Sequence, residues 1–307
     1  MYKIASYKNG NVITTIYNDG TKTHFTKDDE FKFDFAETYD VLISERCNNG
    51  CSWCYANCTK DGKEGNLLDW KFFDTLHPYT EMAINIQSPI HPHLFPFLYN
   101  MKEKGVIVNA TVNQNHFMKD EVYRFLDFLI NYGYITCIGV SLTDPTQEGF
   151  IERVKKYPNA VIHVIAGIVS PEDVDYLKDK DLKLLILGYK NKGRGKGYYE
   201  DSSTLIGDNI AWLESGVFTE LINGFKVISF DNLAVEQLHV RNYLTEEQWE
   251  RFYGGDDGTC SFFIDLVNGR FARSSLSETY YPINGLSIDE MFNVIRREVE
   301  TETKETV

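Results

Sequence analysis

The stretch "ISERCNNGCSWCYANC", residues 43–58, places three cysteines at intervals of four and then three residues. These are Cys47, Cys51 and Cys54, and Cys58 follows shortly after. Thiolates bind soft and borderline metals, so three of them in one short loop can hold one face of an iron–sulfur cluster or part of a zinc site. Structural zinc needs four ligands, usually two well-separated C-x-x-C pairs, and the sequence has no second pair. The loop therefore leaves one metal position open.

The composition favours a globular chain that binds a metal. Hydrophobic residues make up 43 % of the 307 residues, which is ample for a sizeable core. A net charge of −14 makes bulk nucleic-acid binding unlikely, because that binding depends on Lys and Arg. The sequence shows no run of about 18 apolar residues and no signal-peptide pattern, so we expect a cytoplasmic protein with no membrane partner. The clustering of four of the six cysteines indicates a metal rather than a disulfide scaffold.

Short apolar runs alternate with amphipathic helical patterns from residue 40 onward. Helices are expected at 120–133 and 170–177. Such alternation indicates an α/β fold in which helices cover a parallel sheet. The even spacing of the strands, and the lack of a G-x-G-x-x-G turn after the first one, favour a partial TIM-type barrel over a dinucleotide fold. The expected strands are 40–44, 82–86, 106–112, 137–142, 160–167, 183–188 and 226–231.

The two ends of the chain lie outside this alternation. Strand-like runs flank a tight turn at residues 18–20, which predicts a small β meander. Residues 261–275 read as a hairpin, and residues 287–300 read as a terminal helix with a capping box at its start. The predicted parts are an N-terminal meander (1–39), a barrel core (40–243) and a C-terminal hairpin and helix that cover the barrel mouth (244–307).

The cysteine motif resembles a known signature. Cys47-x-x-x-Cys51-x-Trp53-Cys54 is similar to the motif of the radical S-adenosylmethionine enzymes. The resemblance implies a partial (β/α)6 barrel over roughly residues 40–240, three cysteine ligands to a [4Fe–4S] cluster, and Trp53 close to the adenine. It also implies that S-adenosylmethionine chelates the fourth iron and is cleaved reductively to a 5′-deoxyadenosyl radical. Such an oxygen-sensitive enzyme would need an electron donor such as flavodoxin or ferredoxin.

The chain departs from this family after the second barrel strand. Many members carry a Gly-Gly-Glu-Pro-like segment there, which meets the methionine amino group. The corresponding stretch here is "AINIQSPIHPHL" (83–94), which lacks the glycines and the acid. Side chains or exposed carbonyls of Asn85, Gln87 and Ser88 would supply the acceptors. The alternative is a strand-to-helix turn with no ligand role.

Polar residues on later strands are further candidates for contacts with the cofactor or the substrate. Asn109, Thr111 and Asn113 alternate along the third strand, so they share one face, and a polar lumen suits them better than the underside of helices. The resemblance places Ser141 near the carboxylate or ribose of the cofactor. His163, on the fifth strand, is either a core histidine or a residue that faces the ligand.

Cations and isolated thiols supply the catalytic candidates. The loop "GYKNKGRGKG" brings Lys190 and Arg194 to the C-terminal ends of strands, where barrel active sites gather. The glycines beside these cations permit close approach of the backbone to an anion such as a phosphate or a carboxylate, so the loop favours an anionic substrate. Lys190 is therefore a catalytic candidate, the alternative being a solvated surface loop. Cys260 is a second one, as a hydrogen-atom donor or a covalent handle for the substrate. Cys58 is expected to be a bystander, since the fourth metal position must stay open.

Three functional hypotheses follow. The first is a radical S-adenosylmethionine enzyme that acts on a small molecule, a nucleotide or a peptide. The second is a glycyl-radical activase that acts on a protein partner. The third is a non-catalytic protein whose cysteine loop holds zinc or a degenerate cluster, and the missing Gly-Gly-Glu segment is its best support.

Overall fold

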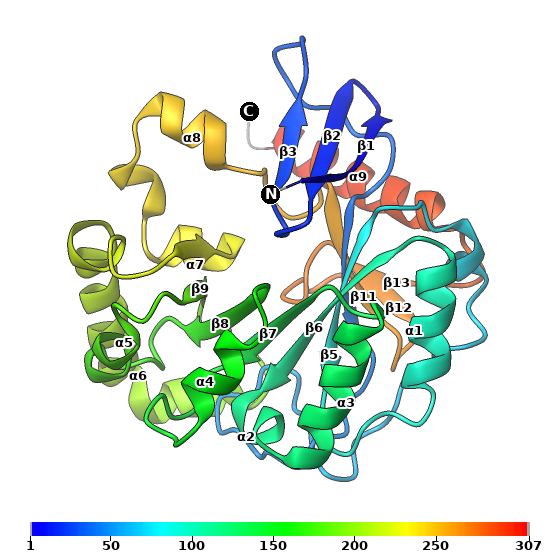
Figure 1. The fold of residues 1–307 in the computed structure, drawn as a ribbon. Coiled ribbons are helices and arrows are strands. Elements are labelled where there is room, and N and C mark those ends of the chain that lie inside the picture. The colour runs from blue at the N-terminus through cyan, green and yellow to red at the C-terminus, as the bar shows by residue number, and fades with distance from the viewer. Residues whose placement is uncertain (1, 306–307) are drawn as a thin grey trace.

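A mostly parallel sheet of ten strands forms the frame of the structure, a computed structural model that describes residues 2–305 (Figure 1). Its strands are β4 (Thr38–Leu42), β5 (Glu81–Ile86), β6 (Ile107–Asn113), β7 (Cys137–Ser141), β8 (Ala160–Ile165), β9 (Lys183–Leu187), β10 (Val227–Phe230), β11 (Ser261–Asp265), β12 (Arg270–Ala272) and β13 (Tyr281–Pro282). Their order across the sheet is β10-β9-β8-β7-β6-β5-β4-β11-β12-β13. Pairing is parallel from β10 across to β11 and antiparallel beyond it. The sheet is a partial barrel, and all the expected barrel strands are confirmed with small shifts in their bounds.

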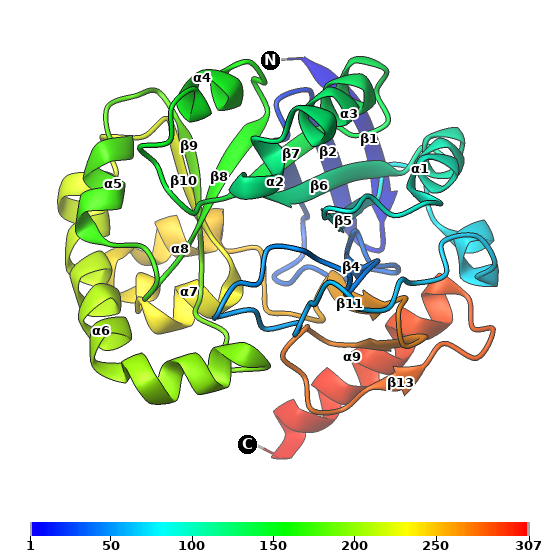
Figure 2. The same cartoon turned by 90° about the horizontal axis from the view of Figure 1, so that it is seen from below.

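Helices lie on the outer side of this sheet (Figure 1, Figure 2). The connection from β4 to β5 carries the cysteine loop and, as its regular helix, the short 3-10 helix η1 (Lys71–Thr75). The later connections carry α1 (Leu94–Glu103), α2 (Gln114–Phe117), α3 (Asp120–Asn131), α4 (Phe150–Lys155), α5 (Pro171–Leu177), α6 (Arg194–Gly216) with the π-helical η2 (Val217–Leu221), and α7 (Asn232–Gln237) with η3 (Val240–Tyr243) and α8 (Glu246–Phe252). The expected helices at 120–133 and 170–177 are thus confirmed, and Ser170 forms the capping box of α5.

The alternation of residues along each strand decides which side chains face the lumen. In β6, Val108 and Ala110 are buried in the core that the sheet shares with the helices. Asn109, Thr111 and Asn113 point to the other face, because successive side chains of a strand point to opposite sides. Thr111 lines a cavity there. The prediction that these three polar residues share one face is therefore confirmed.

The N-terminal segment forms a separate three-stranded antiparallel sheet, as expected for a meander. Its strands are β1 (Lys3–Asn9), β2 (Val12–Tyr17) and β3 (Lys22–Phe25). Glu37, which lies just before β4, ties the meander to the barrel. Its buried carboxylate accepts hydrogen bonds from Thr14 Oγ1 at 2.6 Å and from the His24 ring at 2.7 Å.

The C-terminal segment extends the main sheet. The predicted hairpin is confirmed as β11 and β12, which turn through Asn268 and Gly269. β11 lies parallel to β4, and Phe262 packs between Tyr39 and the ring of Phe292 in α9 (Ile288–Glu305). This burial explains why the hairpin joins the edge of the sheet. The expected capping box of α9 is present, since Ser287 and Glu290 bond each other.

Within residues 2–305, no helix is both long and apolar enough to cross a membrane.

Candidate functional site

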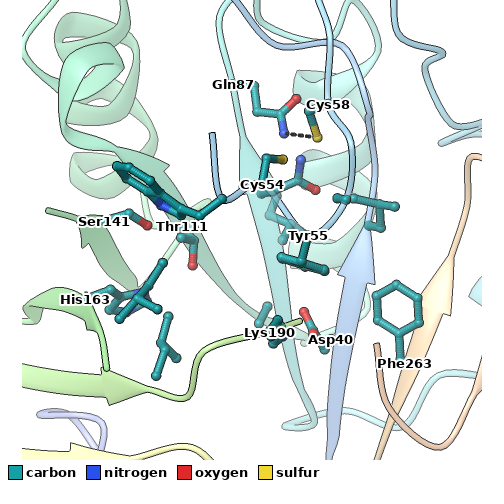
Figure 3. Close-up of a pocket in the computed structure, with 18 of the residues that line it drawn as sticks. Asp40, Cys54, Tyr55, Cys58, Gln87, Thr111, Ser141, His163, Lys190 and Phe263 are labelled. Carbon is teal, nitrogen blue, oxygen red and sulfur yellow. Dashed lines mark hydrogen bonds between the residues drawn. The ribbon is translucent and has the colours of Figure 1, made fainter. Parts of the chain in front are cut away.

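A cavity of about 310 Å³ lies in the lumen of the partial barrel, beside the cysteine loop (Figure 3). Its walls come from the lumen faces of β4 to β9, from residues 53–58 and from Phe263 of β11. It therefore occupies the region where the C-terminal ends of parallel strands meet, which is the usual place for a barrel active site. Several predicted site residues line it: Trp53, Cys54, Asn85, Gln87, Ser141, His163 and Lys190.

Other predicted site residues lie outside this cavity. Asn113 caps α2, since its Oδ1 accepts from the backbone N–H of Asn115 at 2.9 Å. The Oδ1 atom of Asn109 is buried and has no partner among the described residues. Cys260 lies at the start of β11, where its carbonyl accepts from the N–H groups of Glu37 and Thr38. Because β11 runs parallel to β4, this is the end of the barrel opposite the cysteine loop, so Cys260 does not join the candidate site.

Asn49 organises the first two cysteines of the loop. Its side-chain Nδ2 donates to Cys51 Sγ at 2.8 Å, and its backbone N–H donates to Cys47 Sγ at 3.5 Å. Asn115 Nδ2 in turn donates to Asn49 Oδ1 at 2.8 Å. Hydrogen bonds to sulfur stabilise the thiolate form, which is the form that binds metal. Asn49 thus orients the two sulfurs and favours their thiolate form, whereas burial raises the pKa of both the Cys47 and the Cys51 thiol.

The three thiols do not converge on one point. Among the described residues, no three His, Cys, Asp or Glu side chains form a group that could hold a single metal ion. A structural zinc ion needs four donors within about 2.3 Å of one centre. A [4Fe–4S] cluster is larger, and each of its cysteines binds a different iron. Three thiols on one loop are a donor set of the type that a [4Fe–4S] cluster uses.

Arg194 holds the cysteine loop from the opposite side of the barrel. Its Nε donates to the carbonyl of Cys51 at 2.9 Å, and its Nη1 donates to the carbonyl of Cys58 at 2.9 Å. Its backbone N–H donates to the carbonyl of Cys54 at 3.0 Å. The close approach depends on Gly193, which has a positive φ and where a Cβ would meet the Tyr55 carbonyl at 2.4 Å. Arg194 is therefore a positioning residue for the loop, a role different from the anion contact that the sequence suggested.

Asn85 and Ser88 hold the start of the loop. Asn85 Oδ1 accepts from the backbone N–H of Ile43 at 3.0 Å, and its Nδ2 donates to the Ser44 carbonyl at 3.0 Å. The Ser88 carbonyl accepts from the N–H of Asn48 at 3.0 Å. Both polar groups of the Asn85 amide are thus used by the protein backbone. These contacts fix where the chain leaves β4.

Gln87 presents an unsatisfied acceptor at the same end of the cavity. Its Nε2 donates to Cys58 Sγ at 3.5 Å, whereas its Oε1 is buried and has no partner among the described residues. Cys58 is buried and lies beside Cys54, and their hydrogen bond lowers the pKa of Cys54 to about 6. An unpaired buried oxygen is costly unless a ligand supplies a donor.

His163 forms one wall of the cavity and packs against Gly139. The imidazole lies over Gly139 of the neighbouring strand, where an added Cβ would come 2.1 Å from its Cε1 atom. Burial lowers the pKa of His163 to about 4, so the ring is neutral near pH 7. The ring therefore offers the cavity one N–H donor and one acceptor nitrogen.

Replacing Gly139 with alanine is expected to destabilise the protein by about 1–3 kcal/mol, because the new methyl group displaces the His163 ring. The urea midpoint of unfolding measures this effect. Gly207→Ala in α6 is the matched control: nothing lies within 4 Å of its added Cβ, and it should stabilise by about 1 kcal/mol. Wild-type stability of Gly139→Ala would show that the ring is not held over Gly139.

At the other end of the cavity lie two residues that the sequence analysis did not single out, Asp40 and Tyr55 (Figure 3). Asp40 is the central residue of β4 and faces the lumen. The side chain is open to the cavity, but the surrounding protein still desolvates its carboxyl and so raises its pKa, and the charge of Lys190 opposes this shift. The Nζ atom of Lys190 lies 4.3 Å from the centre of the Tyr55 ring and donates to Ser275 Oγ at 2.8 Å. The available signal was a charged residue at the start of the expected strand 40–44, directly before three apolar residues.

The chain has the partial-barrel fold of the radical S-adenosylmethionine enzymes. One similar structure is that of SuiB from Streptococcus suis, solved bound to S-adenosylmethionine. The match covers 86 % of this chain and 68 % of SuiB, with a TM-score of 0.55 and 14 % sequence identity. The structure of anSMEcpe with bound AdoMet matches 85 % of this chain and 82 % of its own length with a TM-score of 0.56 and 14 % identity. No protein-family model matches the chain, and neither does any curated protein sequence.

Proposed function

We propose that the chain is a radical S-adenosylmethionine enzyme that uses one [4Fe–4S] cluster. The observation that carries this proposal is the three-cysteine loop, which follows the first strand of the partial barrel and adjoins the lumen cavity. The fold and the bound cofactor of both similar structures support it. Flavodoxin or ferredoxin is the kind of partner that would supply the electron, and the substrate would be a small molecule, a nucleotide or a peptide.

Cys47, Cys51 and Cys54 are the residues that would hold the cluster. When bound, the cluster supplies the electron that cleaves S-adenosylmethionine and so yields a 5′-deoxyadenosyl radical. Asn49 donates hydrogen bonds to two of the ligand sulfurs, and Arg194 holds the carbonyls of the loop. These contacts would hold the loop in a shape that presents three cysteine ligands and leaves the fourth iron for the cofactor.

Gln87 is the residue that would replace the missing acid of the Gly-Gly-Glu-Pro segment. Its Oε1 atom is buried at the cavity and has no hydrogen-bond partner within residues 2–305, so it can accept from the ammonium group of the cofactor. Trp53 and Ser141 line the same cavity and would contact the adenine and the ribose. Asn85 contributes indirectly, because its side chain already holds the loop.

Replacing Gln87 with leucine is expected to weaken binding of S-adenosylmethionine about 10- to 100-fold, the worth of one hydrogen bond to a charged group. Equilibrium dialysis of the cofactor against the cluster-loaded, unreduced protein measures this. Gln87→Glu restores an acid and should bind at least as tightly as the wild type. Equal affinity in all three proteins would remove Gln87 from the cofactor site.

The proposal is tested by looking for 5′-deoxyadenosine. The protein is purified without oxygen, reconstituted with iron and sulfide, reduced and given S-adenosylmethionine. We expect about four irons per chain and 5′-deoxyadenosine as product. Zinc in place of iron, together with no 5′-deoxyadenosine, would overturn the proposal and favour a non-catalytic metal-binding protein.

A further inference from the structure

Asp40 carries an unpaired carboxylate into the lumen. Its neighbours Tyr39 and Val41 are buried on the helix side of β4, so Asp40 faces the cavity. Its register partners on the adjacent strands are Ala83 of β5 and Phe263 of β11, and neither side chain can donate a hydrogen bond. Among the described residues, no side chain donates to this carboxylate or lies in an ion pair with it. The side chain is exposed to the solvent of the cavity, so a ligand that enters the lumen can reach the carboxylate.

Lys190 carries the opposite charge into the same end of the cavity. Its Nζ atom is held by Ser275 Oγ and by the Tyr55 ring, and the described part of the chain places no carboxylate within 4.0 Å of it. Figure 3 shows Asp40 and Lys190 at the end of the cavity away from Gln87 and Cys58. The two charges therefore face one space without pairing with each other.

A ligand that satisfies both charges must carry a donor and an acceptor close together. An amine alone would pair with Asp40 but would meet the positive charge of Lys190. A carboxylate alone would pair with Lys190 but would meet the negative charge of Asp40. An α-amino-acid group carries an ammonium and a carboxylate on one carbon, so it matches both residues. The rings of Tyr55 and Phe263 provide apolar walls for the rest of such a ligand.

We propose that this end of the cavity binds the α-amino-acid group of the substrate, with the ammonium on Asp40 and the carboxylate on Lys190. The inference rests on the proposed function, since it assigns the opposite end of the cavity, beside Gln87 and Cys58, to S-adenosylmethionine. It replaces the purely anionic ligand that the cations of the loop suggested. Of those cations, Arg194 binds the cysteine loop, and Lys192 donates to the Ser275 carbonyl and to Tyr280.

The test compares L-alanine with its two fragments, ethylamine, which lacks the carboxylate, and propanoate, which lacks the ammonium group. Ligand-observed NMR titrations use the cluster-loaded protein with S-adenosylmethionine and no reductant, so no turnover occurs. We expect L-alanine to bind about 10-fold more tightly than either fragment. Asp40→Asn should remove the advantage of L-alanine over propanoate, and Lys190→Met should remove its advantage over ethylamine. This crossed pattern would not arise from general loss of structure.

Lys192→Met is the matched control, because it perturbs the same loop but does not line the cavity. It should bind L-alanine as the wild type does. No binding of L-alanine to the wild type, or equal binding of the three probes, would overturn the inference. Weaker binding of S-adenosylmethionine to Asp40→Asn would overturn it too, because the site would then belong to the cofactor. The titration is then repeated on iron-free protein. Binding of L-alanine to that protein supports this inference by itself, whereas failure to form a cluster would overturn only the proposed function.

Discussion

Replacing Cys47, Cys51 or Cys54 with alanine is expected to leave the protein without a cluster and without formation of 5′-deoxyadenosine. Under the proposed function each change removes one of three protein ligands and the fourth position is taken by the cofactor, so two thiolates remain to hold the cluster. The measurements are iron and sulfide content after reconstitution, and 5′-deoxyadenosine after reduction. All three variants should behave alike.

Cys58→Ala is the control for this series. Its thiol lies beside Cys54 and is buried, so its removal costs about 1 kcal/mol through a small cavity but leaves the three ligands in place. We expect normal iron content and normal product. The opposite pattern, with cluster loss in Cys58→Ala and retention in Cys54→Ala, would show that Cys58 is the third ligand.

Replacing Arg194 with alanine is expected to have the next largest effect. The change removes two charged hydrogen bonds to the carbonyls of Cys51 and Cys58, each worth about 1.5–3 kcal/mol. The loop then keeps only the backbone hydrogen bond from residue 194 to the Cys54 carbonyl as its attachment at the start of α6, and the cluster should be lost much faster to a chelator. The decay of the cluster absorption measures this rate, and the urea midpoint measures the loss of stability.

Two further variants separate geometry from charge at this position. Arg194→Lys keeps the charge but cannot reach two carbonyls with one planar group, so it should lie between alanine and the wild type. Lys196→Ala removes an exposed cation two residues further along α6 and should change nothing. Equal chelator resistance of Arg194→Ala and Lys196→Ala would show that the cysteine loop holds its shape without the arginine.

The fold and the position of the metal motif were predictable from local patterns. The hydrophobic periodicity of strands and helices can be recognised within a short stretch of sequence. The order of elements from β4 to β10 and the hairpin of β11 and β12 were therefore predictable. The alternation of Asn109, Thr111 and Asn113 predicted a polar lumen face for the same reason. The parallel pairing of β11 with β4 was not predictable, because it joins segments far apart in the chain.

The sequence by itself determined the three-cysteine loop, the strand on which it begins and the partial barrel around it, because these depend on spacing between near neighbours. Only the tertiary structure decided what the other polar residues do. Arg194 binds a carbonyl 143 residues away, and Cys260 lies at the end of the barrel away from the loop. The sequence marks Asp40 only as a charged residue on an expected strand, and its register partners decide that no neighbouring strand residue can donate to it. Such roles depend on which strands and loops become neighbours, and packing across the whole barrel decides that.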